Sequence, residues 1–264
     1  MIAPQSANAE VTVEISESHI AVVTLCRPEA RNAINGAVTA ALDRIVRSTE
    51  LDPEVWVVVL TGSGGRAFCA GADLKEVAAG RLESLFTRDG GFAGLVRARR
   101  SKVWIAAVDG LALAGGFEIA LACDLIVASE DAEFALPEVK RGLIAAAGGL
   151  YRLPRALPRA LAFELIATGE RLTAARALTF GLINRVMPKE QTLPEALSLA
   201  RAIAANAPVA VRESLSIARQ APDLDEEALA RLSEEGQQRI MCTEDFIEGP
   251  RAFIEKRAPR WSGR

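Results

Sequence analysis

Histidine is almost absent from this chain, which has only His19 among its 264 residues. A Ser-His-Asp triad would need that residue beside a nucleophile, and the sequence contains no G-x-S-x-G nucleophile elbow. His19 lies in the stretch Ser18 to Val22, which is typical of a strand and favours a structural role. The chemistry of the protein is therefore expected to rest on carboxylates, main-chain groups, lysine, tyrosine or cysteine.

Cysteine is also scarce, with four residues spread along the chain and no C-x-x-C pair. This spacing provides no zinc site and is typical of reduced cysteines in a cytoplasmic protein. The first ten residues have neither the basic and apolar regions of a secretory signal nor the arginines of a mitochondrial transit peptide. No apolar run reaches the roughly 18 residues that a membrane span requires. We expect a cytoplasmic protein without a membrane partner.

An excess of positive charge is missing as well. The chain has 31 basic and 34 acidic residues, a net charge of -3 and a pI of about 5.5, so no general attraction to nucleic acid is expected. A local basic patch is formed by Arg97, Arg99, Arg100 and Lys102. We favour a solvated helix end over a binding surface for this cluster.

Strand signals alternate with helix signals over the first 190 residues. Val11 to Ile15 alternates apolar with polar residues, and four further runs are continuously apolar, as strands covered on both faces are: 20–25, 55–60, 103–108 and 125–128. A weaker strand is predicted at 182–187. Asn35 is a candidate N-cap for a helix with apolar positions at i, i+3, i+4, i+7 and i+8. The pattern predicts an α/β core over residues 1–190.

Only helix signals follow, so residues 191–264 are predicted to form a helical C-terminal subdomain. Asp225 is a candidate cap for a helix over 226–241. Gly249-Pro250 is predicted to break the last helical segment and to restart it with proline in the first turn.

Two glycine-rich loops interrupt the core directly after apolar strands. One spans residues 61–75 and the other spans residues 109–118. Small residues in such loops allow tight turns and a close approach of a ligand to main-chain N–H groups. Neither loop contains a G-x-x-x-x-G-K-[ST] phosphate loop or a G-x-G-x-x-G dinucleotide fingerprint. Plain glycine-containing turns remain the alternative interpretation.

Two glutamates lie close to these features. Glu118 follows Gly116 in the first turn of an otherwise apolar helix, and Glu138 follows Pro137 after the strand at 125–128. Each alone is typical of a capping or solvated carboxylate. As a pair flanking one strand, they could converge on one site, where apolar surroundings can hold one carboxyl protonated and the other ionised.

Seven segments of the sequence together resemble the crotonase (enoyl-CoA hydratase/isomerase) superfamily, in the family's order and over nearly the whole chain. They are RPEARNAIN (27–35), AFCAGADLKE (67–76), DGLALAGGFEIALACDLIVAS (109–129), FALPEVKRGL (134–143), AGGLYRLPRAL (147–157), GLINRVMP (181–188) and EGPRAFIEKR (248–257). The resemblance implies a spiral of repeated strand-strand-helix turns closed by helices, with the helical region serving trimerisation. It also implies an acyl-CoA thioester substrate, no metal or other cofactor, and a homotrimer or a dimer of trimers.

The resemblance further implies roles for single residues. Glu118 and Glu138 match the two hydratase carboxylates, and the amides of Ala72 and Gly115 match the oxyanion hole. The substrate and CoA contacts fall on residues Ala30, Arg31, Ala70, Asp73, Leu74, Lys75 and Ala146, together with Phe253 and Lys256, which would reach the CoA of a neighbouring subunit. Selection of the acyl group is expected in the segment of residues 78–102.

With both glutamates present, the expected reaction is addition of water to a 2-enoyl-CoA thioester, giving 3-hydroxyacyl-CoA. Glu118 is expected to take a proton from water and Glu138 to supply one at Cα. Stretches such as GGFAGL (90–95) and the tail at 243–264 look closer to crotonobetainyl-CoA (carnitine-type) hydratases. An enoyl-CoA isomerase and a non-catalytic or RNA-binding relative remain as alternatives.

Two positions depart from the pattern of typical hydratases. Ala114 stands where many members have glycine, and Ala145-Ala146 replaces Pro-Gly. Alanine keeps an amide N–H at position 146, which in the family helps hold the catalytic water, but it resists a positive φ. The substitution is therefore expected to narrow the pocket or to shift the water.

Overall fold

The computed structural model describes residues 9–17 and 19–264. The chain divides into two compact units, Met1–Ala200 and Arg201–Arg264. The first unit contains every strand of the described residues. The predicted boundary between residues 190 and 191, and the trimerisation role of the second part, stay predictions.

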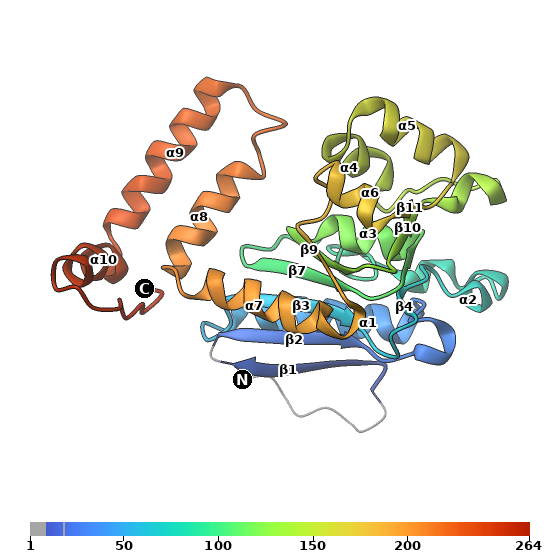
Figure 1. The fold of residues 1–264 in the computed structure, drawn as a ribbon, viewed down its shortest axis with the longest axis horizontal. Coiled ribbons are helices and arrows are strands. Elements are labelled where there is room, and N and C mark those ends of the chain that lie inside the picture. Colours follow the sequence, from blue (N-terminus) through green and yellow to red (C-terminus); the bar gives the residue numbers. More distant parts are fainter. Residues whose placement is uncertain (1–8, 18) are drawn as a thin grey trace. The chain divides into compact units, whose positions relative to one another are not determined.

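A six-stranded sheet forms the centre of the first unit (Figure 1). Only its edge strand β1 is antiparallel to its neighbour, and the remaining pairs are parallel. The continuously apolar runs of the sequence become its inner strands, because a parallel strand is covered on both faces. In spatial order the strands are β1 (Val11–Glu17), β2 (Ile20–Leu25), β3 (Val57–Gly62), β7 (Val103–Val108), β9 (Leu125–Ser129) and β12 (Arg185–Met187).

A smaller sheet of four short strands accompanies the large one. Its order is β11 (Leu172–Thr173), β10 (Glu133–Ala135), β8 (Leu111–Leu113) and β4 (Ala67–Cys69). Three times the chain passes from a strand of the large sheet to one of the small sheet and then to helical structure: β3–β4–α2, β7–β8–α3 and β9–β10–η3. This repetition confirms the predicted spiral of strand-strand-helix turns.

The helices of the first unit begin where local chemistry predicts. Asn35 caps α1, its side chain accepting a hydrogen bond from the Val38 amide at 2.8 Å. Val38, Leu42 and Ile45 are buried along one face of that helix. The helical segments are η1 (Pro28–Ala30), α1 (Gly36–Leu51), α2 (Leu74–Ala78), η2 (Leu82–Leu85), α3 (Gly115–Ala122), η3 (Pro137–Arg141), α4 (Gly149–Ala156), α5 (Arg159–Thr168), α6 (Ala174–Thr179) and η4 (Lys189–Gln191).

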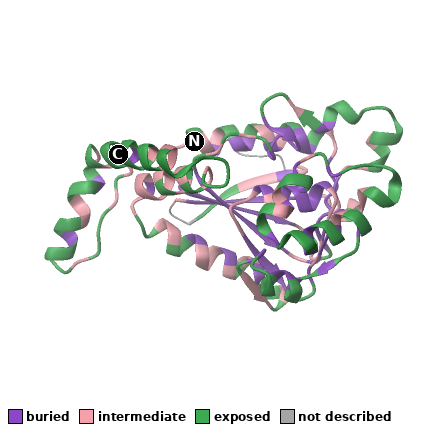
Figure 2. Cartoon of the chain, turned by 90° about the horizontal axis from the view of Figure 1, so that it is seen from above, coloured by how far each residue is buried: buried purple, intermediate pink, exposed green. Residues whose placement is uncertain are grey.

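The hydrophobic core follows the inner strands β2, β3, β7 and β9, and much of the sheet is coloured as buried in Figure 2, whereas many helix faces are exposed. Trp104 in β7 is fully buried, and the rings of Phe117 in α3 and Phe134 in β10 pack 5.2 Å apart. These aromatic contacts join α3 to the small sheet. The helix that carries Glu118 is therefore fixed against the strand that precedes Glu138.

The C-terminal helices are α7 (Thr192–Ala204), α8 (Pro208–Ala218), α9 (Glu226–Met241) and α10 (Glu244–Ile254). Asp225 caps α9, as predicted. The predicted break at Gly249-Pro250 is wrong, because Pro250 lies inside α10. The clash that disfavours helix before proline involves the Cβ of the preceding residue, and Gly249 has none. Among the described residues, no helix is long and apolar enough to span a bilayer.

The basic cluster at residues 97–102 is not a helix end, which corrects that interpretation. The segment has no helical conformation, and its cations separate. Arg97 and Arg99 are exposed, Arg100 donates to the Ala122 carbonyl, and Lys102 is buried. His19 likewise lies in the turn before β2, with φ 70, and stacks on Trp56 at 3.6 Å, so its structural role holds although its predicted strand position does not.

Lys102 closes the C-terminal end of α1. Its ammonium donates to the Thr49 and Asp52 carbonyl oxygens, where the helix dipole is negative. Lys102→Met is expected to lower the free energy of unfolding by about 3 kcal/mol, because buried carbonyls lose a charged donor. Urea unfolding measures the change, with the exposed Arg99→Met as control. A loss no larger than that of the control would contradict this role.

Candidate active site

The candidate site lies where three neighbouring strands of the small sheet end. β4 leads into Ala70-Gly71-Ala72, β8 leads into Ala114-Gly115, and β10 leads into Pro137-Glu138. These three strands are mutually parallel across β8, so their carboxyl ends share one edge. Such an edge is where open parallel sheets bind ligands.

Two main-chain amides at this edge lie close to each other. A Cβ added to Gly71 would lie 3.0 Å from the Gly115 nitrogen. Within the part of the chain that the structure describes, neither the Ala72 nor the Gly115 N–H donates to a protein acceptor. Gly115 is the first residue of α3, where an amide has no partner in the helix. The geometry is that of an anion-accepting pair of donors.

Ala114 holds the second donor in an unusual conformation. Its φ is 51° and its ψ is -128°, a region that residues with a side chain seldom adopt. Its N–H donates to the Ala135 carbonyl at 2.9 Å, which ties the start of α3 to β10. Backbone strain of this kind costs on the order of 1–3 kcal/mol and clusters at functional sites.

The Ala72 amide is held in place by contacts between two loops, residues 27–34 and residues 70–73. The Ala70 amide donates to the Arg31 carbonyl at 3.0 Å, and Ile34 pairs with the 71–73 segment through two further bonds. Arg27 donates to the Asp73 carboxylate at 3.0 Å. Burial alone would raise the pKa of Asp73, but the Lys75 amide and Arg27 outweigh it and hold that pKa below its ordinary value.

These contacts between the two loops bring together most of the residues predicted to contact CoA. They form one continuous run of chain surface around η1 and the start of α2: Ala30, Arg31, Ala70, Asp73, Leu74 and Lys75. Leu74 is 66% exposed, and the side chains of Arg31 and Lys75 are exposed as well. Two exposed cationic side chains therefore lie on this surface, available to a phosphate-bearing ligand.

Glu118 is buried in the first turn of α3, only 3% exposed. Its Oε1 accepts a hydrogen bond from the Gly149 amide at 2.9 Å. Burial raises the pKa of Glu118 to about 7, with a further upward contribution from the charge of Glu138, while the Gly149 amide and Arg152 act in the opposite direction. A carboxyl with this pKa can act as a base near neutral pH.

Glu138 lies in the first turn of η3 and is half-buried. Its Oε2 is buried and has no hydrogen-bond partner among the described residues. Burial also raises the pKa of Glu138, against a smaller opposing effect of Arg141. The charge of Glu138 acts on Glu118, which is buried, whereas Glu138 itself keeps part of its surface exposed.

Ala146 is placed differently from its expected role. Its φ is not positive, and its amide donates to the Ile144 carbonyl at 2.9 Å. The amide that meets a catalytic carboxyl is that of Gly149, at the start of α4. Gly149 was not among the predicted site residues, although the Gly148-Gly149 doublet before a helical stretch could have indicated a main-chain amide there.

The segment of residues 78–102 reaches the site through Phe92. A Cβ added to Gly115 would lie 2.4 Å from Phe92 Cε1, so the ring packs directly on the second oxyanion donor. Phe92 belongs to a short hairpin, β5 (Phe86–Thr87) and β6 (Gly91–Phe92), and its ring meets Phe86 edge-on at 5.6 Å. This pair of aromatic rings therefore borders Gly115.

Phe253 and Lys256 belong to the second unit. Phe253 is in the last turn of α10 and is 86% exposed, and Lys256 follows that helix with φ 53. Their contact with the CoA of a neighbouring subunit stays a prediction. Within residues 9–17 and 19–264, no group of three histidine, cysteine, aspartate or glutamate side chains could hold a metal ion.

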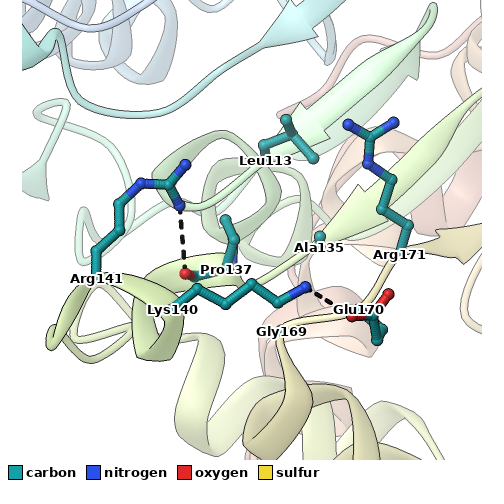
Figure 3. Close-up of a pocket in the computed structure, with 8 residues that line it drawn as sticks. All are labelled: Leu113, Ala135, Pro137, Lys140, Arg141, Gly169, Glu170 and Arg171. Carbon is teal, nitrogen blue, oxygen red and sulfur yellow. Dashed lines mark hydrogen bonds and ion pairs between the residues drawn. The ribbon is translucent and has the colours of Figure 1, made fainter.

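A cavity of about 470 Å³ opens at the same edge of the small sheet (Figure 3). Its wall includes Leu113 at the end of β8 and Pro137 next to Glu138, but neither glutamate. The Lys140 ammonium pairs with Glu170 at 2.7 Å, and Arg141 and Arg171 flank the opening. The cavity borders the chain segment that carries Glu138 and has a largely cationic rim.

Almost the whole chain matches one known protein family. Residues 15–264 match the family model described as enoyl-CoA hydratase/isomerase. Mevalonyl-coenzyme A hydratase sidH of Aspergillus fumigatus is 42% identical over 254 residues, covering 94% of this chain and 93% of the relative. Carnitinyl-CoA dehydratase of Salmonella arizonae is 42% identical over 246 residues, covering 91% and 94%.

Solved structures of related proteins have the same fold as this chain. Enoyl-CoA hydratase from Mycobacterium tuberculosis superposes with a TM-score of 0.93 at 41% identity, covering 97% of this chain and all of the other. Carnitinyl-CoA hydratase from Mycobacterium avium has a TM-score of 0.76 at 45% identity, covering 98% and 100%. With a family match over almost its full length, the chain belongs to the enoyl-CoA hydratase/isomerase family.

Proposed function

We propose that this protein is a hydro-lyase that adds water reversibly across the double bond of a 2-enoyl-CoA thioester, giving the 3-hydroxyacyl-CoA. One observation carries the proposal. A buried carboxyl, Glu118, and a half-buried one, Glu138, both with raised pKa values, lie at the strand edge that also presents two main-chain N–H groups without acceptors among the described residues. The relatives named above, which are hydratases or dehydratases of CoA thioesters, support the same chemistry.

In this mechanism Glu118 takes one proton from a water molecule while the water oxygen bonds to Cβ of the substrate. The electron pair of the double bond moves onto the thioester, which becomes an enolate. The Ala72 and Gly115 amides stabilise the charge on its oxygen, and each such donor is worth roughly 3–4 kcal/mol. Glu138 then gives a proton to Cα. Glu118 is now protonated and Glu138 ionised, so Glu118 releases its proton and Glu138 takes one up, through solvent, before the next turnover.

The assignment of base and acid rests on the partners of each carboxyl. Glu118 accepts an N–H hydrogen bond, which favours its ionised form, and its pKa of about 7 leaves it largely ionised at pH 8. Glu138 has a buried oxygen without a partner in the described chain, which favours the neutral acid. The charge of an ionised Glu138 would also raise the pKa of Glu118.

CoA recognition is proposed for the loop surface around η1 and α2, where Arg31 and Lys75 can meet its phosphates. The chemistry proposed here requires no metal and no redox cofactor, since the main-chain donors carry the developing charge. We also propose a homotrimer or a dimer of trimers located in the cytoplasm. In such an assembly Phe253 and Lys256 complete the CoA site of a neighbour.

The acyl group is the finer question. A short acyl chain with a polar substituent is favoured, because relatives at 42% identity are named for carnitinyl-CoA and mevalonyl-CoA. Loss of the enoyl absorbance can be followed with crotonyl-, crotonobetainyl- and branched enoyl-CoA thioesters, and a 3-enoyl-CoA serves as the isomerase substrate. Hydration of none of them, with isomerisation of the last, would replace this proposal by an isomerase.

Replacement of Glu138 by glutamine is expected to lower kcat for hydration by about 10²-fold, because the amide cannot donate an acidic proton to Cα. KM should change little, since the side chain contributes no proposed CoA contact. Steady-state kinetics on the best thioester of the panel measures both constants. Glu170→Gln, an exposed carboxyl of the adjoining cavity, is the matched control. Turnover of the Glu138 variant at the level of that control would exclude the acid role.

A further inference from the structure

Arg152 in α4 makes contacts that reach both halves of the candidate site. Its Nη2 donates to the Val96 carbonyl at 2.5 Å, and its Nη1 donates to the Ala147 carbonyl at 3.2 Å. The guanidinium also lies over the Tyr151 ring, 5.0 Å from its centroid. Within the described chain no carboxylate forms an ion pair with this cation, so its donors serve main-chain oxygens instead.

Each of the two carbonyls belongs to a segment that touches a proposed catalytic group. Ala147 lies two residues before Gly149, whose amide donates to Glu118. The Val96 amide donates to the Phe92 carbonyl at 3.3 Å, and the Phe92 ring packs on Gly115. One side chain therefore joins the segment facing the base to the segment facing the oxyanion donor.

The chain is shaped to admit this guanidinium. A Cβ added to Gly148 would lie 1.8 Å from Arg152 Nη1, and the φ of Gly148 is +124°. Only glycine combines that conformation with that approach. Gly148 is also the N-cap residue of α4, so the space it leaves is next to the amide that meets Glu118.

We propose that Arg152 is a positioning residue for the hydration reaction, fixing the 147–149 loop against the 92–96 turns so that the Gly149 amide stays directed at Glu118. The inference rests on the proposed function. The charges that face Glu118 are Glu138 on η3 and Arg152 on α4, and Arg152 itself faces Arg100. Arg152 thus supplies both a fixed geometry and the one cation beside the base among the described residues.

The test compares three variants with the wild-type protein. Arg152→Met removes both the positive charge and the guanidinium that binds two carbonyls. Arg152→Lys keeps the charge but not the guanidinium. Arg155→Met changes an exposed arginine of the same helix. For Arg152→Met we expect kcat to fall about 10- to 100-fold with little change in KM, as misplacement of a reacting group does. The acidic limb of its pH profile should move up by about 1 unit, since an opposite charge near Glu118 is lost.

For Arg152→Lys we expect the acidic limb of the pH profile to stay near its wild-type position, because the charge is kept. We still expect kcat to fall, because one ammonium cannot bind both carbonyls as the planar guanidinium does. Arg155→Met should resemble the wild type in both measurements. Thermal unfolding of each variant identifies losses that come from unfolding alone. An unshifted limb in folded Arg152→Met, whatever its kcat, would overturn the proposal.

A second readout separates this inference from the proposed function. The side-chain carboxyl of Glu118 can be titrated by NMR in protein labelled with ¹³C at glutamate carboxyls, with Glu118→Gln identifying its signal. The titration midpoint of Glu118 should be higher in Arg152→Met than in the wild type and unchanged in Arg155→Met. This holds even if no thioester of the panel is hydrated. A wild-type protein without hydratase activity would refute the proposed reaction, whereas an unchanged midpoint would refute the role of Arg152.

Discussion

Replacement of Glu118 by glutamine is expected to lower kcat for hydration by about 10³-fold, within the range known for loss of a general base. The amide oxygen can still accept the Gly149 hydrogen bond, so the loop before α4 keeps its place. What is lost is the ability to take a proton from water. Stopped-flow or steady-state hydration of the preferred enoyl-CoA at pH 8 measures the effect, and near-wild-type turnover would rule out the proposed base.

The same substitution should stabilise the fold, which separates loss of function from loss of structure. The pKa of Glu118 is about 7 in the folded protein against an ordinary 4.5. The folded state therefore binds this proton more tightly, a contribution present in full below pH 4.5 and lost as the pH rises through 7. At pH 8 the variant is expected to gain up to about 3 kcal/mol. Urea unfolding at pH 5 and pH 8 should show the gain growing with pH, and a loss of stability at pH 8 would contradict the assigned pKa.

Gly115→Ala is expected to lower kcat by about 10²- to 10³-fold, as removal of one oxyanion donor does. The added Cβ would lie 2.4 Å from Phe92 Cε1 and 2.6 Å from Cζ, too close for any real contact. Either the ring or the start of α3 must move, and movement of α3 carries the Gly115 amide away from the thioester oxygen. The effect should fall on kcat, because the amide binds developing charge more strongly than the ground-state carbonyl.

A double variant tests the cause. All three of the nearest atoms to the added Cβ belong to Phe92, so Phe92→Ala makes room for it. Phe92→Ala with Gly115→Ala should recover at least about tenfold in kcat over Gly115→Ala alone, since additivity fails for residues in contact. Phe92→Ala alone, followed by thermal unfolding, gives the cost of the cavity. Without any recovery, steric displacement of the donor is not the explanation.

Local signals were sufficient for much of the fold and for the local structure around Glu118. Continuous apolar runs predict inner strands because a parallel sheet is covered on both faces, and β3 and β7 follow that rule. Caps such as Asn35 depend on a side chain and an amide three residues away, so they can be read from a short window. Glu118 was placed correctly in the first turn of a helix for the same reason.

Features that depend on distant contacts were beyond such reasoning. Lys102 looked like a surface cation, but it binds carbonyls at the end of α1, some fifty residues earlier in the chain. Arg152 and Val96 are likewise 56 positions apart. The amide of Ala146 was expected to face the site, yet a local bond to Ile144 occupies it and Gly149 takes that place. Each of these outcomes is decided by tertiary packing rather than by neighbours in the sequence.

Because Glu138 and the Gly115 amide are attached to the ends of paired strands, the spacing between acid and donor is a property of strand alignment. In β8 and β10, Leu113 stands opposite Ala135. A slip of one residue would displace the acid by about 3.3 Å and turn it to the opposite face. Side chains along these strands can therefore vary widely in evolution while the reaction persists, provided that the alignment of the two backbones is preserved.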